Sequence, residues 1–120
     1  ATPNHGVSGN VMAFCSIFGE ESECRDMNEA SLFINKLNTG ENPKIQVYNI
    51  IGLGCEMDGE KGDGIVKNSS AYLDYAENYY VNGECSTLVY FHNEILFPEK
   101  YPAVYDLIVK SIEQNSSINL

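Results

Sequence analysis

Basic residues are scarce in this chain of 120 residues, which carries 7 lysines and arginines against 17 aspartates and glutamates. The formal net charge of -10 argues against the basic surface by which proteins bind nucleic acid or an anionic membrane. No stretch approaches the roughly eighteen apolar residues that a membrane-spanning helix needs. We therefore expect a soluble protein with no nucleic-acid partner and no transmembrane segment.

The four cysteines lack the short C-x2-C spacing of zinc sites, and we expect neither a metal nor another cofactor. Disulfides are the better interpretation, and Cys15 and Cys24 are close enough in sequence to form one. Two N-glycosylation sequons begin at Asn68 and Asn115, and we expect Asn68 to be unmodified. Disulfides and sequons together indicate a secreted or extracellular protein.

The length fits one domain, and the sequence patterns predict alternating helices and strands. Apolar residues recur at helical spacing in three segments, while two β-branched or aromatic runs resemble buried strands. Asp26 or Asn28 is a suitable first N-cap, and Gly40 a suitable terminator. The order is helix, strand, helix, strand, helix, over residues 26–40, 45–51, 69–80, 86–91 and 101–114. This order predicts an α/β fold with parallel strands and flanking helices.

An acid and a histidine follow the two predicted strands. Asp63 lies between Gly62 and Gly64 after the first strand, and His92 directly follows the second. The carboxyl ends of parallel strands share one edge of the sheet, where ligands and catalytic groups gather. We therefore expect Asp63 and His92 to lie close together. His5, between an asparagine and a glycine, is expected to shape a turn.

The same strand assignment bears on the two remaining cysteines. Cys55 follows the carboxyl end of the first predicted strand, and Cys85 precedes the amino end of its parallel neighbour. An ordinary strand would separate them by roughly 17–20 Å. A disulfide needs Cα atoms about 4.4–6.8 Å apart. The predicted distance disfavours a Cys55–Cys85 disulfide and leaves open the alternative that one of the two pairs with an upstream segment.

Three short motifs resemble the lipases and esterases of the α/β-hydrolase fold. "GDGIV" at 62–66 resembles the loop that carries the acid of the catalytic triad, "FHNEIL" at 91–96 resembles the histidine loop, and "ATPNHG" at 1–6 resembles a lipase turn. The nucleophile motif Gly-x-Ser-x-Gly is absent, since Ser8 in "GVSGN" lacks the second glycine. The chain thus resembles the C-terminal portion of such a domain.

The resemblance implies a serine hydrolase that acts on a small-molecule or lipid ester. Asp63 would be the acid that orients His92, and His92 the general base. The nucleophile and the missing strands would be supplied by an upstream segment of the same protein. Residues 7–27 would form a cap over the acyl site, although the apolar side chains there are also typical of a buried helix.

Two alternatives remain open from the residues themselves. The acids Asp58, Glu60 and Asp63 in "DGEKGDG" could serve a secreted, calcium-dependent binding module. That loop departs from the EF-hand pattern, which needs glycine where Asp63 stands and glutamate where Ser69 stands. A catalytically inactive hydrolase relative is the second alternative.

Overall fold

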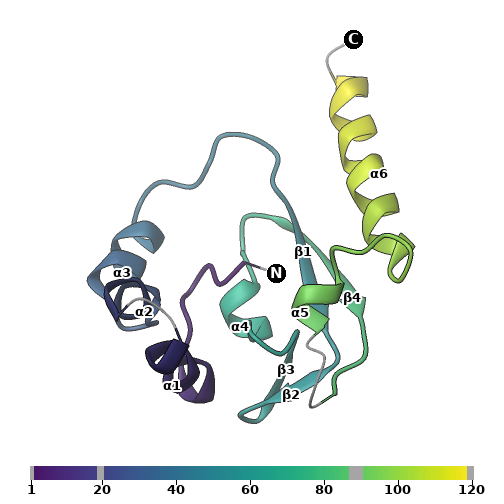
Figure 1. Ribbon diagram of the computed structural model, residues 1–120. Helices are drawn as coiled ribbons and strands as arrows, with labels where there is room; N and C mark the ends of the chain where they lie inside the picture. The colour runs from purple at the N-terminus through teal and green to yellow at the C-terminus, as the bar shows by residue number, and fades with distance from the viewer. Residues whose placement is uncertain (1, 19–20, 87–90, 119–120) are drawn as a thin grey trace.

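A computed structural model describes residues 2–18, 21–86 and 91–118. In this part of the chain short helices and strands alternate, and each is positioned by a local sequence signal. Figure 1 shows the N-terminal helices on one side of the central strands and the last helix extending away on the other. The elements are α1 Gly9–Phe18, α2 Glu21–Met27, α3 Leu32–Asn38, β1 Tyr48–Leu53, β2 Cys55–Met57, β3 Glu60–Gly62, α4 Asn68–Ala71, β4 Glu77–Asn82, α5 Phe91–Glu94 and α6 Pro102–Ile118.

The central feature is a parallel pair of strands, β1 and β4, in register from Tyr48 opposite Glu77 to Leu53 opposite Asn82. A parallel sheet flanked by helices confirms the predicted α/β class. The predicted first strand, 45–51, overlaps β1 with a shift of two to three residues. Of the predicted second strand, 86–91, residues 87–90 lie outside the described part of the chain.

The predicted helix over 69–80 was wrong. Helix α4 ends at Ala71, and Tyr72 already has an extended backbone with ψ 136°. The Asn78 side chain then closes a turn by binding the backbone of Leu73 and Ala76. Tyrosines and valine follow, and these residues favour a strand over a helix. The segment therefore enters β4 and supplies the partner strand that was expected later in the chain.

The predicted helix over 26–40 is shorter in the structure and begins later. Its N-cap is Ser31, whose hydroxyl accepts a hydrogen bond from the Ile34 amide at 3.1 Å. The Asn28 side chain instead accepts from the Ala30 amide, at 2.8 Å, within the preceding turn. The last residue of α3 is Asn38 and its C-cap is Thr39, so the expected terminator Gly40 follows directly after the cap. Asp26 lies within the separate helix α2, so neither expected N-cap begins α3.

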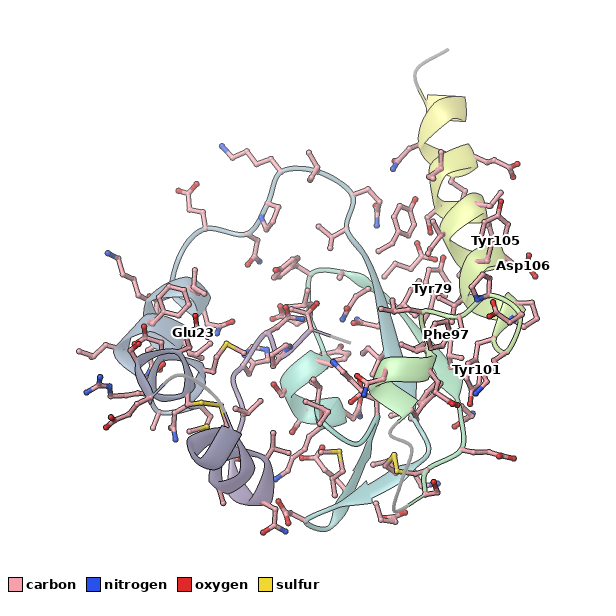
Figure 2. All side chains as sticks on the ribbon, in the orientation of Figure 1. Glu23, Tyr79, Phe97, Tyr101, Tyr105 and Asp106 are labelled. Atoms are coloured by element: carbon pink, nitrogen blue, oxygen red, sulfur yellow. A yellow bond between two sulfur atoms is a disulfide. The ribbon has the colours of Figure 1, made fainter. Side chains whose placement is uncertain are left out.

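The core lies against both faces of β1 and β4. Ile51 packs with Val66 and Ala71 in one cluster. A second cluster joins the β2–β3 hairpin and the sheet to α5 and the start of α6, and its buried residues are Cys55, Met57, Val81, Phe91, Ile95 and Val104. Tyr101, labelled in Figure 2 near the start of α6, places its ring 4.7 Å from that of Phe91. The segment from α5 to α6 is thereby fixed to the sheet.

Both pairs of cysteines form disulfides. Cys15 joins Cys24, as the sequence spacing favoured, and links α1 to α2. Cys55 joins Cys85 with Cα atoms 5.1 Å apart, so the expectation that they stay apart was wrong. The error follows from the misplaced second strand. Because β4 ends at Asn82, Cys85 follows the carboxyl end of β4, at the same edge where Cys55 follows β1.

Candidate active site

The acid turn from Gly62 to Lys67 aims one carboxylate into the protein. Asp63 is fully buried, and its Oδ1 accepts hydrogen bonds from the amides of Ile65 at 3.0 Å and Val66 at 2.7 Å. The Asp63 amide donates back to the Val66 carbonyl at 3.1 Å. Gly64 has φ 99°, a backbone conformation that residues other than glycine rarely adopt. The turn therefore fixes Oδ1 and leaves Oδ2 for another donor.

That donor is His92, in the first turn of α5. Its Nδ1 lies 2.7 Å from Asp63 Oδ2, and its backbone amide donates to the Asp63 carbonyl at 2.8 Å. The side chain of His92 is 31% exposed while that of Asp63 is 0% exposed. The structure thus brings together the two residues expected at the sheet edge, and it leaves the histidine in contact with solvent.

The electrostatics of the pair favour an ionised carboxylate. Burial raises the pKa of Asp63, but the hydrogen bond from His92 and those from the Val66 and Ile65 amides outweigh burial and hold that pKa below its ordinary value. An ionised carboxylate only accepts hydrogen bonds, so Nδ1 of His92 carries the proton that joins them. In the neutral ring Nε2 then has a free lone pair and can act as a base.

His5 has a different environment. Its amide donates to the Ser70 carbonyl at 3.0 Å, and its Nε2 lies 3.0 Å from the Tyr72 carbonyl oxygen. These contacts tie the N-terminal turn to the end of α4. They agree with the expectation that His5 shapes a turn.

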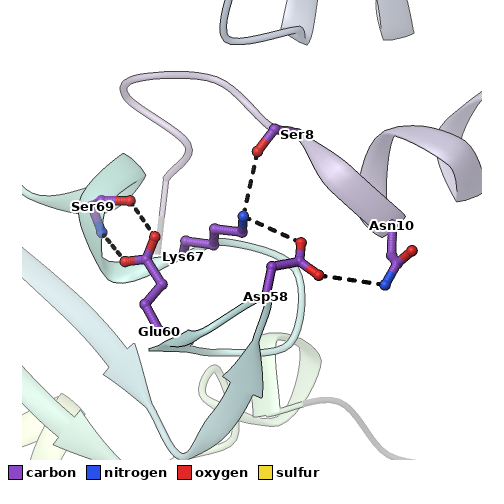
Figure 3. A network of polar contacts seen from close by, with 6 residues as sticks. All are labelled: Ser8, Asn10, Asp58, Glu60, Lys67 and Ser69. Atoms are coloured by element: carbon purple, nitrogen blue, oxygen red, sulfur yellow. Dashed lines mark hydrogen bonds and ion pairs between the residues drawn. The ribbon is translucent and has the colours of Figure 1, made fainter.

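Asp58, one of the three acids considered for calcium, is held by Lys67. Figure 3 shows Lys67 Nζ between Asp58 Oδ2, at 3.2 Å, and Ser8 Oγ, at 3.5 Å. In the second contact Lys67 donates to the Ser8 hydroxyl oxygen.

Glu60 is likewise engaged, since it accepts from the Ser69 amide at 3.0 Å and the Ser69 hydroxyl at 2.6 Å. Asp58, Glu60 and Asp63 therefore each have a separate partner in Lys67, Ser69 and His92. Within residues 2–18, 21–86 and 91–118, no group of three or more histidines, cysteines, aspartates or glutamates could hold a metal ion.

A cavity of about 280 Å³ lies beside the acid turn. Its lining includes Gly64 and Ile65 of the acid turn and Asn10 and Val11 of α1. Residues of the expected cap segment, 7–27, therefore face the residues that follow Asp63. The base of this segment is closed by a backbone bridge between Val7 and Asn28.

The two sequons differ in their surroundings. Asn68 begins α4, and its Oδ1 is buried. Asn115 lies on α6 and is exposed. The expectation that Asn68 is unmodified stays a prediction.

The sequence patterns did not predict the contacts of Phe91, the residue that precedes His92. Phe91 is fully buried, and Gly52 and Gly83 lie beneath its ring. A glycine inside an apolar strand is a signal of close approach by another group, and Gly52 carried that signal.

No described helix is both long and apolar enough to cross a membrane.

Comparisons with protein-family models, with curated proteins and with solved structures found no match to this chain.

Proposed function

We propose that this chain supplies the acid and the base of a serine hydrolase that cleaves carboxylic esters. The observation that carries the proposal is the 2.7 Å contact between Nδ1 of a partly exposed His92 and Oδ2 of a fully buried Asp63. His92 takes the proton of a nucleophilic serine as that serine attacks the ester carbonyl. His92 then returns the proton to the leaving alcohol.

Asp63 suits the supporting role because its two oxygens contact different partners. Two backbone amides hold Oδ1, so Oδ2 is presented to the histidine in a fixed direction. The lowered pKa of Asp63 keeps the carboxylate charged at neutral pH, where it stabilises the imidazolium that forms during proton transfer. It also keeps the proton of neutral His92 on Nδ1, which leaves Nε2 available to the serine.

The nucleophile in this proposal lies upstream of the 120 residues. Ser8, the serine in the motif closest to the expected pattern, contacts a lysine that Asp58 already pairs. The described part of the chain also has only β1 and β4 in its parallel sheet, which is fewer strands than an independently stable sheet usually has. Further strands from the same protein would complete the sheet and bring the serine to its edge, as in the α/β-hydrolase fold.

The segment from 7 to 27 is proposed as a cap over the ester. Its two helices are joined by the Cys15–Cys24 disulfide, and α1 borders the cavity beside the acid turn. The substrate is a small-molecule or lipid ester. The two disulfides are compatible with a secreted protein, and we place the reaction outside the cell.

The test is ester hydrolysis by the complete protein carrying His92→Ala or Asp63→Asn, with a chromogenic short-chain ester as substrate. Both variants are expected to lose on the order of 10⁴-fold in kcat while circular dichroism shows an unchanged fold. His5→Ala is the matched control, since it removes the other histidine, and it should retain activity. Wild-type turnover by His92→Ala would mean that the Asp63–His92 pair is structural.

A further inference from the structure

The residue before His92 packs against two glycines, one within β1 and one directly after β4. Phe91 is fully buried, and its ring lies against Gly83, where an added Cβ would overlap the ring atoms. An added Cβ at Gly52 of β1 would lie 2.9 Å from Cε1 of the same ring. We call Gly52 and Gly83 the glycine slot. Any side chain at either position would displace the phenylalanine.

Gly52 also touches the acid. An added Cβ there would lie 2.9 Å from the Cβ of Asp63, as well as from the Phe91 ring. Gly52, which has only a hydrogen atom in place of a side chain, therefore lies close to both Asp63 and Phe91. The distance between the backbones of Asp63 and His92 is set by how closely both approach this strand, and their 2.8 Å backbone hydrogen bond depends on that approach.

The two sides of the slot are tied together beyond the ends of the strands. The Gly83 amide donates to the Leu53 carbonyl at 2.8 Å, which extends the pairing of β1 and β4. The Cys55–Cys85 disulfide then joins the segments that follow β1 and β4, just past that hydrogen bond. Cys55 also belongs to the buried cluster that contains Phe91. The width of the slot is thus fixed by a hydrogen bond and by a covalent link.

We propose that Phe91, seated in the glycine slot, is a positioning residue that holds His92 Nδ1 against Asp63 Oδ2. The helix that carries the histidine is only four residues long, Phe91–Glu94, so its own hydrogen bonds do little to fix the ring. The phenylalanine anchors it from within the sheet. The consequence for catalysis rests on the proposed function, but the consequence for the contact between the two side chains does not.

Nitrogen-15 NMR of the histidine-labelled protein tests the contact directly, with the signal of each histidine assigned by substitution. His92 and His5 are the only histidines of the 120 residues, so His5 serves as an internal reference. In the wild type, the His92 Nδ1–H proton should be observed and protected from exchange by Asp63. Gly83→Ala should abolish that signal, because its methyl group lifts Phe91 from the slot, while the His5 signals stay unchanged. Gly52→Ala should abolish it too, but its methyl group meets both Phe91 and Asp63, so Gly83→Ala is the variant that isolates the role of Phe91.

Gly40→Ala is the matched control, since an added Cβ there meets only the Leu37 carbonyl oxygen, at 3.8 Å. It should leave the His92 signal intact. Phe91→Leu provides a milder variant in case an alanine in the slot prevents folding, and it should weaken protection of the Nδ1 proton. An unchanged His92 signal in a folded slot variant, or in Phe91→Leu, overturns the proposal.

Ester hydrolysis by the same variants separates this inference from the proposed function. If both hold, the slot variants lose about 10- to 100-fold in kcat with little change in KM, because a small displacement of a catalytic group costs that much. If the NMR signal is lost but turnover matches that of the wild type, the positioning inference stands and the catalytic assignment fails. If turnover falls while the His92 signal is intact, the slot does not act through His92 and the inference fails.

Discussion

The region from β1 to α5 and the region of the three N-terminal helices differ in how far their large apolar side chains are buried. The first encloses Phe91, Ile51 and Val66, which are all less than 2% exposed. In the second, Leu32 is 89% exposed and Phe33 is 51% exposed. Burial on both faces fixes the positions of residues in the strand region, and the Asp63–His92 contact lies there. The helices have few such constraints, which suits a segment that borders a site without building it.

The comparison is sharpest for two phenylalanines. Phe91→Ala should lower the free energy of unfolding by about 3–5 kcal/mol, because it leaves a cavity in the core. Phe33→Ala, the same change on the exposed side of α3, should cost about 1 kcal/mol or less. Chemical denaturation measures both. Equal losses of unfolding free energy in the two variants would show that Phe33 is buried in the complete protein. The difference in burial between the two regions would then hold only for the 120 residues by themselves.

The two disulfides should also differ in their contributions. The Cys55–Cys85 bond closes a loop with a sequence separation of 30, against 9 for Cys15–Cys24. The chain-entropy relation gives about 4 kcal/mol for the longer loop and about 3 kcal/mol for the shorter one. Replacing each pair with serines should therefore destabilise the protein more at the strand region, by about 1 kcal/mol. Thermal unfolding of the two double variants side by side measures the difference, and the reverse order would contradict it.

A smaller effect follows from the pKa of Asp63. Because that pKa is lowered in the folded protein, the carboxylate contributes stability that is fully present above its unfolded pKa, about 3.9. The contribution is lost as the pH falls through the folded value. The difference in unfolding free energy between wild type and Asp63→Asn should thus be larger at pH 5 than at pH 2. A difference that stays constant over this range would show that Asp63 gains nothing from ionisation.

The sequence predicted the proximity of Asp63 and His92 better than it predicted the strand between them. Asp63 was recognised from its glycines and its place after an apolar strand, and both features belong to the local turn. The location of β4 could not be predicted in the same way, because the apolar residues of 72–80 have helical spacing in the sequence. In the structure the helix ends at Ala71, and the Asn78 side chain closes a turn with the backbone of Leu73. The Cys55–Cys85 pairing was missed for the same reason. The glycine slot depends on contacts between distant segments, which no local pattern contains.

The central claim is that His92 activates a serine, and labelling with a fluorophosphonate tests it most directly because this reagent traps serines activated for acyl transfer. The complete wild-type protein should be labelled rapidly, and His92→Ala should be labelled on the order of 10³- to 10⁴-fold more slowly. Mass spectrometry should place the label upstream of the 120 residues, and these residues alone should take up none. Equal labelling rates for wild type and His92→Ala would contradict the claim, and a label on Ser8 would place the nucleophile within this chain.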